Sequence, residues 1–361
     1  MSAEPEKTSK PKNYRVILKS RPGANETPKE ENFSVVCCPY PDDELEEETV
    51  LVKSLYISVD PAMRCRMNED TGVHYIHPWN LGQCVEGFGG VGKVEKSNSK
   101  RFQEGDIVTM GLNWMWQTYF VSEAAALEKV DRTVVGDHVS LVLSCFGLTG
   151  LTALLGIWVK GHIKPSCNQT VVVSGAAGAT GSLAGQIAKI EGCKQVVGIC
   201  GSDEKCHFLL KELSFDVSVN YKTESVEERL KKTCPDGIDV YFDNVGGELS
   251  DTVIKQMAEN SHIILCGQIS QYNQDVPYPP PISPEITKIL QERKITRERF
   301  LVLNYPEMYE EALKQLVEWL RSGKLKVKET VEHGLENTPR AFISMMNGGN
   351  IGKQLVCVSV P

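Results

Sequence analysis

The sequence has no cysteine pair at the spacing of a metal or redox motif. Twelve cysteines occur in 361 residues, a share well below that of disulfide-stabilised secreted domains. No C-x-x-C pair is present. The nearest neighbours are the adjacent Cys37 and Cys38, and Cys200 with Cys206, which have five residues between them. Neither spacing is typical of a zinc ribbon or a redox dithiol, so we expect a reduced, cytoplasmic protein.

An excess of basic charge and an apolar leader are also missing. Lysine and arginine total 39 against 47 aspartate and glutamate residues, which gives a formal net charge of −8. A nucleic-acid-binding protein would show a basic surface, so we expect no nucleic-acid partner. The first twelve residues (MSAEPEKTSKPK) are polar and contain no apolar stretch of a signal peptide. We predict a disordered tail over residues 1–12.

Uncharged apolar runs long enough to cross a bilayer are scarce. One run, from Val139 to Val159, passes this test. Gly147, Gly150 and Gly156 interrupt the run, and neither flank carries a basic cluster. We therefore interpret it as two short buried pieces, of which the second is a helix, and expect no membrane association.

The chain length favours two domains, because 361 residues exceed what one hydrophobic core usually fills. Up to about residue 138, short apolar runs such as YRVILKS and WQTYFV are cut by glycine, proline and aspartate, which indicates a β-rich, barrel-like domain. We expect this domain to comprise residues 13–138 and 316–361. A second domain, residues 139–315, would be inserted between these two parts.

The inserted segment alternates strands with helices, and its strands are almost wholly apolar. This pattern is typical of a parallel sheet covered on both faces, as in the doubly wound nucleotide-binding fold. The predicted helices include residues 182–191, 205–213, 226–232 and 309–322. The predicted strands are Thr170–Ser174, Gln195–Cys200, Val217–Asn220, Asp239–Asp243, His262–Cys266 and Phe300–Leu303, and Leu355–Ser359 would close the first domain.

A glycine-rich turn follows the first of these strands. Its residues Gly178, Ala179, Thr180 and Gly181 lead into a helix. The pattern is a variant of the dinucleotide fingerprint, in which glycine lets the backbone approach a pyrophosphate and the helix N-terminus supplies N–H donors. The strand before the turn and the helix after it meet the required context, so we predict a dinucleotide site.

The end of the second strand favours NADPH over NADH. An NAD enzyme usually places Asp or Glu there to bind the ribose 2′-hydroxyl, whereas this chain has Gly201 and Ser202. These small residues leave room for a 2′-phosphate, with which Lys205 can pair. Tyr221, after the third strand, could donate a further hydrogen bond. A surface lysine on the next helix is the alternative interpretation of Lys205.

Several longer runs point to a known family: SVDPAMRCRMNED, VVSGAAGATGS, YFDNVGG, CGQISQYN, FLVLNY and GGNIGKQ. With these runs the sequence resembles the medium-chain dehydrogenase/reductase superfamily, in its zinc-free branch of leukotriene B4 dehydrogenases and prostaglandin reductases. Within that branch it resembles the 15-oxoprostaglandin 13-reductases most. The resemblance covers nearly the whole chain. It implies a GroES-like catalytic domain with an inserted Rossmann domain, NADPH as the cofactor, and a monomer or homodimer.

The resemblance also implies roles for individual residues. Gly178 to Gly181 would face the pyrophosphate, while Lys205 and Tyr221 would hold the 2′-phosphate. The backbone of Phe300, Leu301 and Val302 would bind the nicotinamide carboxamide, and the rest of the cofactor would be lined by Asn244, Cys266, Gly267, Gln268, Ile269, Ser270, Gln271, Tyr272 and Asn350. The substrate would be lined by Tyr75 and Tyr272, with Leu112 and Asn113 beside them.

The implied reaction is reduction of a carbon–carbon double bond conjugated to a ketone. The substrates would be 15-oxo-prostaglandins and the products their 13,14-dihydro-15-oxo forms. After hydride transfer to the β-carbon, charge builds on the carbonyl oxygen, and Tyr272 would stabilise this enolate directly or through the nicotinamide ribose hydroxyl. A packing tyrosine is the alternative. Ala62, Leu112 and Asn113 depart from the family pattern, in which aromatic residues are commoner, and bear on substrate range.

The remaining histidines, cysteines and tryptophans give no sign of a metal site or a reactive thiol. His74 and His77 lack a cysteine partner, so we predict no zinc site. Cys65 and Cys266 are expected to be buried and unreactive. The tryptophans Trp79, Trp114 and Trp116 either wall an apolar pocket or fill the barrel core. Two alternative functions stay open: a general quinone or alkenal reductase of the same superfamily, and an NADPH-binding protein with little catalysis.

Overall fold

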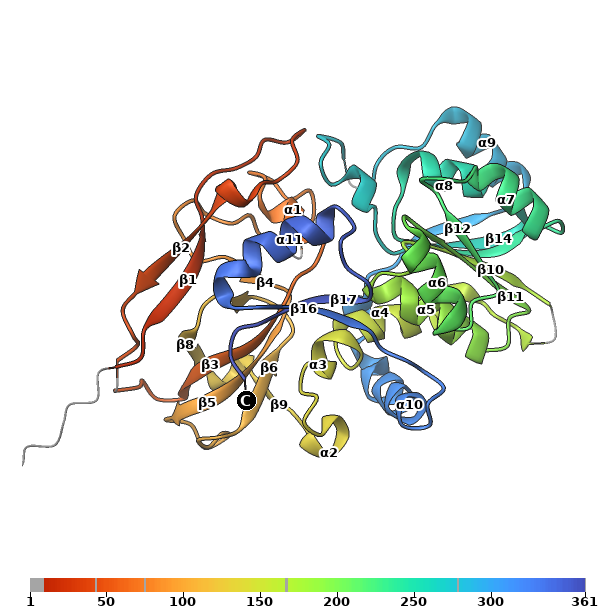
Figure 1. The fold of residues 1–361 in the computed structure, drawn as a ribbon. Helices are drawn as coiled ribbons and strands as arrows, with labels where there is room; N and C mark the ends of the chain where they lie inside the picture. Colours follow the sequence, from red (N-terminus) through yellow and green to blue (C-terminus); the bar gives the residue numbers. More distant parts are fainter. Residues whose placement is uncertain (1–9, 43, 75, 166–167, 278, 361) are drawn as a thin grey trace, which may run out of the picture.

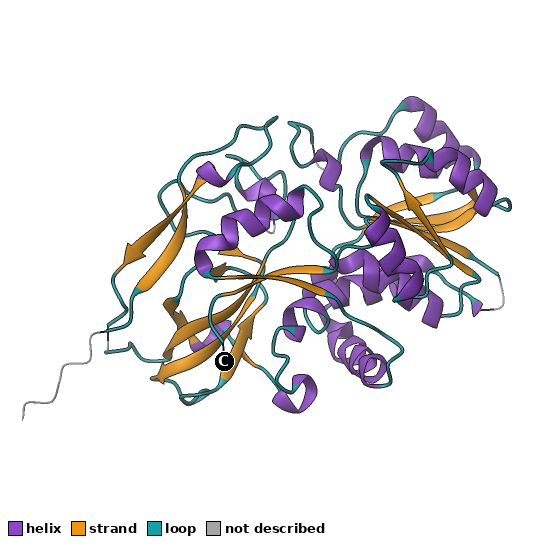
Figure 2. Cartoon of the chain, viewed as in Figure 1, coloured by secondary structure: helices purple, strands orange, loops and turns teal. Residues whose placement is uncertain are grey.

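The computed structural model describes residues 10–42, 44–74, 76–165, 168–277 and 279–360. It has two lobes, and each lobe contains its own large β-sheet (Figure 1). The first lobe is rich in strands, whereas helices cover both faces of the sheet in the second lobe (Figure 2). This arrangement confirms the predicted fold class of a β-rich domain joined to a doubly wound domain. Most of the predicted tail, residues 1–9, lies outside the described residues.

A seven-stranded sheet in the first lobe joins the two ends of the chain. Strand β17 (Lys353–Cys357) pairs antiparallel with β3 (Thr49–Ser58), and β16 (Glu329–His333) lies parallel to β17. The predicted closing strand is therefore present, although it begins at Lys353 rather than at Leu355. The lobe also contains β1 (Asn13–Leu18), β2 (Phe33–Cys38), β4 (Glu86–Gly87), β5 (Gly90–Ser97), β6 (Ile107–Met110), β7 (Trp114–Met115), β8 (Tyr119–Glu123), β9 (Glu128–Lys129), α1 (Met63–Arg66), α2 (Arg132–Val135) and α11 (Thr338–Met346).

The three tryptophans singled out in the sequence belong to the core of the first lobe. Trp114 and Trp116 are fully buried, and only 3% of Trp79 is exposed. The ring of Trp116 lies 6.0 Å from the rings of both Phe33 and Trp79, at the distance of favourable aromatic pairs. None of these three residues lines the cavity between the lobes. They fill the core and do not wall the pocket.

The second lobe contains a six-stranded sheet in which every pairing is parallel. Two separate apolar clusters cover its faces, one with α4 (Leu148–Gly156), α5, α6 and α10 and the other with α7, α8 and α9. The helices are α5 (Ala179–Ile190), α6 (Asp203–Lys211), α7 (Val226–Thr233), α8 (Gly247–Ile254), α9 (Pro284–Glu292) and α10 (Tyr309–Arg321). The strands, in spatial order, are β12 (Val217–Asn220), β11 (Gln195–Cys200), β10 (Thr170–Ser174), β13 (Ile238–Asp243), β14 (Met257–Leu265) and β15 (Thr296–Arg299).

The sixth predicted strand, Phe300–Leu303, was wrong. The sixth strand is β15, which lies directly before this run. Its polar residues gave no strand signal, because an edge strand can expose polar side chains that a central strand cannot. Phe300 follows the strand and is only 4% exposed; its ring stacks on Tyr305 at 5.4 Å. The apolar run therefore anchors a short 3-10 turn, Val302–Asn304, against the core.

The uncharged run after residue 138 folds as two pieces, as predicted, and the first piece is also helical, whereas only the second was expected to be. These are α3 (Leu141–Ser144) and α4 (Leu148–Gly156), which continues as a π-helical turn. Gly150 lies in the first turn of α4, where a β-carbon would lie 1.7 Å from the carbonyl oxygen of Cys145, so glycine lets α4 approach the end of α3. Leu141–Gly161 is long and apolar enough to cross a membrane, yet 56% of its most apolar window is buried inside the protein. Because α4 packs against α5 and α10, we interpret it as a core helix.

Candidate active site

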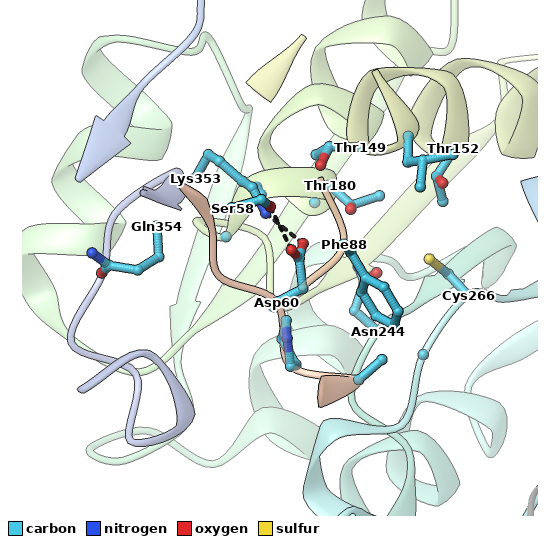
Figure 3. Close-up of a pocket in the computed structure, with 18 of the residues that line it drawn as sticks. Ser58, Asp60, Phe88, Thr149, Thr152, Thr180, Asn244, Cys266, Lys353 and Gln354 are labelled. Atoms are coloured by element: carbon cyan, nitrogen blue, oxygen red, sulfur yellow. Dashed lines mark hydrogen bonds and ion pairs between the residues drawn. The ribbon is translucent and has the colours of Figure 1, made fainter. Parts of the chain in front are cut away.

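A cavity of about 1220 Å³ lies between the two lobes. Small-molecule pockets commonly measure roughly 300–1,000 Å³, so this cavity has room for a cofactor together with a substrate. Figure 3 shows part of its wall, to which Ser58 and Phe88 contribute from the first lobe and Asn244 and Cys266 from the second. Most predicted site residues line it: Leu112, Gly178, Ala179, Thr180, Gly181, Lys205, Tyr221, Asn244, Cys266, Gly267, Ile269, Ser270, Gln271, Tyr272, Leu301, Val302 and Asn350.

Four predicted residues are not on this wall. Gln268 and Phe300 lie behind it, with 2% and 4% of their surfaces exposed. Asn113 has a positive φ of 63°, and its side-chain oxygen accepts a hydrogen bond from Arg66 Nη1 at 3.4 Å. Tyr75 lies outside the described residues.

The glycine turn brings the N-terminus of α5 to the cavity. Gly175 has a φ of +58°, which favours glycine, and it directs the chain from the buried strand β10 into the turn. A β-carbon on Gly181 would lie 2.4 Å from the carbonyl oxygen of Gly175, so the helix packs closer to the strand than a side chain permits. Gly178 to Gly181 line the cavity at the helix end whose N–H groups lack partners within the helix. This geometry fits a pyrophosphate.

The end of β11 supplies the features of a 2′-phosphate site. Ser202 caps α6 by accepting a hydrogen bond from the Lys205 backbone N–H at 3.2 Å, which places Lys205 on the cavity wall. The Lys205 Nζ atom donates to the carbonyl oxygen of Gly348 at 2.8 Å. Asp203 does not line the cavity and accepts a hydrogen bond from Asn220 Nδ2 at 2.7 Å, so it does not occupy the place of a ribose-binding acid.

A second cation lies at this end of the cavity. Lys222 lines the same wall as Lys205 and was not assigned from the sequence. Burial lowers the pKa of the Lys205 ammonium, and the charge of Lys222 lowers this pKa further. The ring of Tyr221 lies over Gly201, where a β-carbon would approach the tyrosine hydroxyl to 2.9 Å. Two ammonium groups and a phenol are suitable partners for a phosphate dianion.

Asp243 holds the strand ends in the middle of the cleft. Its carboxylate is fully buried and accepts hydrogen bonds from the Tyr241 hydroxyl at 2.9 Å, the Ser250 hydroxyl at 2.6 Å and the backbone N–H of Val245 at 3.0 Å. The next residue, Asn244, donates from Nδ2 to the carbonyl oxygen of Ser174 at 2.8 Å. The ends of β10 and β13 are thereby joined directly beneath the cavity.

Tyr272 lies on the cavity wall after a 3-10 turn, Ile269–Gln271. Its hydroxyl oxygen accepts a hydrogen bond from the backbone N–H of Gln268 at 3.3 Å, so the ring folds back over Gly267. The turn is fixed by Ile269 N–H, which donates to the carbonyl oxygen of Asn244 at 3.2 Å. A phenol that accepts at its oxygen can also donate its own proton. Tyr272 thus has the chemistry and the position to act on a molecule in the cavity.

The opposite wall carries a charged cluster that sequence reasoning missed (Figure 3). Lys353 forms an ion pair with Asp60, and the Ser58 hydroxyl donates to Asp60 Oδ2 at 2.5 Å. The preceding residue, Gly352, donates from its backbone N–H to the carbonyl oxygen of Ala177 at 2.7 Å, which joins the start of β17 to the glycine turn. Asp60 lies in the run SVDPAMRCRMNED and Lys353 in the run GGNIGKQ, but nothing in the sequence pairs these two distant residues.

The cysteines near the cleft are held as neutral thiols. Burial raises the pKa of Cys65 to about 11 and that of Cys266 to about 12. The thiolate is the reactive form of cysteine, so these groups are poor nucleophiles at neutral pH. Cys200 and Cys206 are further apart in sequence than the cysteines of a C-x-x-C motif. Their sulfur atoms nevertheless lie 3.4 Å apart, because the chain folds back between β11 and α6. No group of three or more His, Cys, Asp or Glu side chains in the described part of the chain could hold a metal ion.

Two family models match the chain. Residues 14–130 match the N-terminal domain of oxidoreductases, and residues 179–318 match the zinc-binding dehydrogenases. Together with the nucleotide-binding geometry, these matches define a dinucleotide-dependent oxidoreductase. The chain belongs to the medium-chain dehydrogenase/reductase superfamily.

Full-length relatives support this assignment. A Bacillus subtilis (strain 168) protein, YfmJ, whose name describes an NADP-dependent oxidoreductase, is 43% identical over 92% of this chain and 95% of its own length. Prostaglandin reductase 1 of Rattus norvegicus is 40% identical over 91% of this chain and 94% of its own. The NADPH-dependent curcumin reductase of Escherichia coli (strain K12) is 34% identical over 97% of this chain and 98% of its own.

A solved structure gives the same result for the fold and the cofactor. CurA from Vibrio vulnificus, crystallised in complex with NADPH, is similar to this protein with a TM-score of 0.87 and 34% identity. The similarity covers 96% of this chain and 100% of that chain. The protein is an NADPH-dependent oxidoreductase, as the end of β11 predicted.

Proposed function

We propose that this enzyme reduces the carbon–carbon double bond of 15-oxo-prostaglandins, giving the 13,14-dihydro-15-oxo products. The observation that carries the proposal is the position of Tyr272. Its hydroxyl lies over Gly267, on the cavity wall formed by the ends of the parallel strands, where doubly wound folds bind their ligands. A relative named prostaglandin reductase is 40% identical to this chain, which supports this class of substrate.

The residues of the cavity divide the work in this proposal. When bound, NADPH supplies the hydride that adds to the β-carbon of the enone. Tyr272 donates a hydrogen bond to the ketone oxygen, directly or through the ribose hydroxyl, where negative charge develops. The α-carbon then takes up a proton, which completes the saturated ketone. Lys205 and Tyr221 hold the 2′-phosphate, and the turn Gly178 to Gly181 holds the pyrophosphate.

The wall contributed by the first lobe suits an aliphatic substrate. Phe88, Met110 and Leu112 line this part of the cavity, beside Ala62. Apolar side chains provide the burial that stabilises a fatty chain out of water. The small side chain of Ala62 leaves room beside them, which favours a long or branched substrate.

Loss of NADPH absorbance with purified protein and 15-oxo-prostaglandin E2 tests this function. Fast turnover with NADPH, slow turnover with NADH and little turnover with a simple quinone would support it. Turnover of the quinone alone would assign the general quinone reductase activity instead. Tight NADPH binding without oxidation by any enone would assign a non-catalytic protein.

Curcumin is a second candidate substrate, because a relative named for its reduction is 34% identical over nearly the whole chain. Its double bonds are also conjugated to ketones, so the same tyrosine chemistry applies. The two candidates are distinguished by kcat/KM, which measures transition-state stabilisation for each substrate with the same enzyme. A higher kcat/KM for curcumin than for the 15-oxo-prostaglandin would reassign the substrate and keep the reaction.

A further inference from the structure

The short helix α1 carries a fully buried cation. Arg64 has no exposed surface, and its guanidinium donates four hydrogen bonds to uncharged oxygens. Burial lowers the pKa of this group, because desolvation disfavours the charged form. The position of the guanidinium is fixed by its four hydrogen-bond acceptors. These are Asn68 Oδ1 at 2.7 Å, the carbonyl oxygens of Gly23 at 2.8 Å and Glu26 at 2.9 Å, and Asn273 Oδ1 at 2.9 Å.

One of these four partners belongs to the other lobe. Asn273 directly follows Tyr272 in the loop after β14, whereas the other three partners lie in the first lobe. A second bond joins the same two regions: the backbone N–H of Asp275 donates to Asn25 Oδ1 at 2.9 Å. In Figure 1 the loop before β2 and the loop after β14 approach each other at the top of the view. The two hydrogen bonds identify this approach as a contact between lobes.

Tyr272 is therefore held between two anchors. On the amino-terminal side, Ile269 N–H donates to the Asn244 carbonyl oxygen, and Ser270 N–H donates to the Val245 carbonyl oxygen at 3.1 Å. These bonds fix the loop to the second lobe. On the carboxyl-terminal side, Arg64 and Asn25 fix it to the first lobe. Without the second anchor, nothing in these hydrogen bonds would set the distance from the Tyr272 ring to the wall of the first lobe.

We propose that Arg64 and Asn273 are positioning residues, which place the Tyr272 hydroxyl for the reaction by clasping its loop to the first lobe. The inference rests on the proposed function, in which Tyr272 stabilises the enolate. Neither residue needs to touch the substrate. A planar guanidinium whose four bonds point in fixed directions is suited to this task, whereas a lysine has a single rotating head.

A double-mutant cycle tests the proposal: wild type, Tyr272→Phe, Asn273→Ala, and both together. Displacing a catalytic group by about 1 Å can cost as much as about 100-fold in rate, so we expect Asn273→Ala to lower kcat by at least about tenfold. NADPH affinity should change by less than about twofold. In the Tyr272→Phe enzyme the same substitution should cost less than about twofold, because residues that act as a unit are not additive.

Conservative and control variants separate positioning from general damage. Asn273→Asp keeps an oxygen for Arg64 and should retain most of the wild-type kcat. Asn25→Ala removes the second, exposed bond and should lower kcat less than Asn273→Ala, again only when Tyr272 is present. Asn98→Ala is the control, because the Asn98 side chain also makes a hydrogen bond to a residue distant in sequence, from Nδ2 to the Leu45 carbonyl oxygen, but within the first lobe and away from the cavity. It should leave kcat unchanged.

The outcomes are distinguishable. If Tyr272→Phe is slow and Asn273→Ala lowers kcat by the same factor in both backgrounds, the positioning role is overturned and the proposed function stands. A kcat equal to that of the wild type in Asn273→Ala overturns the positioning role as well. If Tyr272→Phe is as fast as wild type, the enolate role falls and the positioning role falls with it. Should Asn273→Ala fail to fold, Asn25→Ala in the two backgrounds gives the same decision.

Discussion

The Nζ atom of Lys353 forms an ion pair with Asp60 and donates a hydrogen bond to the carbonyl oxygen of Val59 at 3.2 Å. Asp60 follows strand β3, and Lys353 begins strand β17, 293 residues later in the chain. Only 3% of the Lys353 side chain and 20% of the Asp60 side chain are exposed. The pair thus joins β3 and β17, from distant parts of the sequence, within the first lobe at the wall of the cavity.

Removing one partner should destabilise the protein. In Lys353→Met the Asp60 carboxylate loses its cation, and breaking a buried ion pair costs about 3–5 kcal/mol. We expect the lower end, a fall of about 3 kcal/mol in the free energy of unfolding by urea, because Asp60 is partly exposed. The double variant Lys353→Met with Asp60→Asn should lose less. Lys314→Met is the control, since the Lys314–Glu310 pair is exposed. An equal fall in the free energy of unfolding in Lys353→Met and Lys314→Met would contradict the prediction.

Lys205 should determine the preference for NADPH. A hydrogen bond to a charged group contributes about 1.5–3 kcal/mol, so Lys205→Ala should weaken NADPH binding by about ten- to hundredfold. NADH binding should stay the same, because NADH lacks the 2′-phosphate. Titrations of both cofactors measure this ratio. Lys211→Ala, at the exposed end of the same helix, is the control. An unchanged ratio in Lys205→Ala would assign the 2′-phosphate to other residues.

The sequence predicted buried apolar strand segments well and polar ones poorly. Strands β10, β11 and β12 have the predicted bounds. The central strand β14 begins at Met257 rather than at the predicted His262, because its first half carries exposed polar residues. The edge strand β15 reads TRER and carries no apolar signal. The apolar run that follows it was mistaken for the strand, although it serves to anchor a turn.

The nucleotide end of the site could be predicted because its motif is local. The turn from Gly175 to Gly181 and the residues after β11 lie close together in sequence and need only a strand and a helix to position them. The Asp60–Lys353 pair and the Arg64–Asn273 contact could not be predicted, because the bonded residues are 293 and 209 positions apart. Such contacts depend on how the chain returns to the first lobe.

NADPH affinity should fall with rising pH at a lower pH than the pKa of an ordinary lysine would predict. Burial and the nearby charge of Lys222 lower the pKa of Lys205, below about 10.4 for a lysine in water. The ammonium that pairs with the 2′-phosphate is present below this lowered pKa and lost as the pH rises through it. The Kd for NADPH should therefore rise in that window. Lys222→Ala should move the rise to higher pH, and a parallel rise for NADH would contradict the assignment.

Removal of metal should leave the enzyme active. The second family model takes its description from zinc, yet the described residues contain no cluster that could hold an ion. A catalytic zinc needs three protein ligands, commonly histidine, cysteine or carboxylate. We expect dialysis against a chelator to leave kcat unchanged and metal analysis to find less than one zinc per chain. Loss of activity that added zinc restores would overturn the zinc-free assignment.

Gly181 should tolerate no side chain. A β-carbon there would lie 2.4 Å from the Gly175 carbonyl oxygen and 3.0 Å from the Ala176 Cα atom, and both are backbone atoms that cannot rotate away. The first turn of α5 would have to move off β10, which carries its N–H groups away from the pyrophosphate site. We expect Gly181→Ala to weaken NADPH binding and to lower the free energy of unfolding by about 1–3 kcal/mol, the usual cost of overpacking. Gly111→Ala is the matched control, because nothing lies within 4 Å of a β-carbon there. Equal NADPH affinity in the two variants would show that close packing of α5 on β10 does not form the pyrophosphate site.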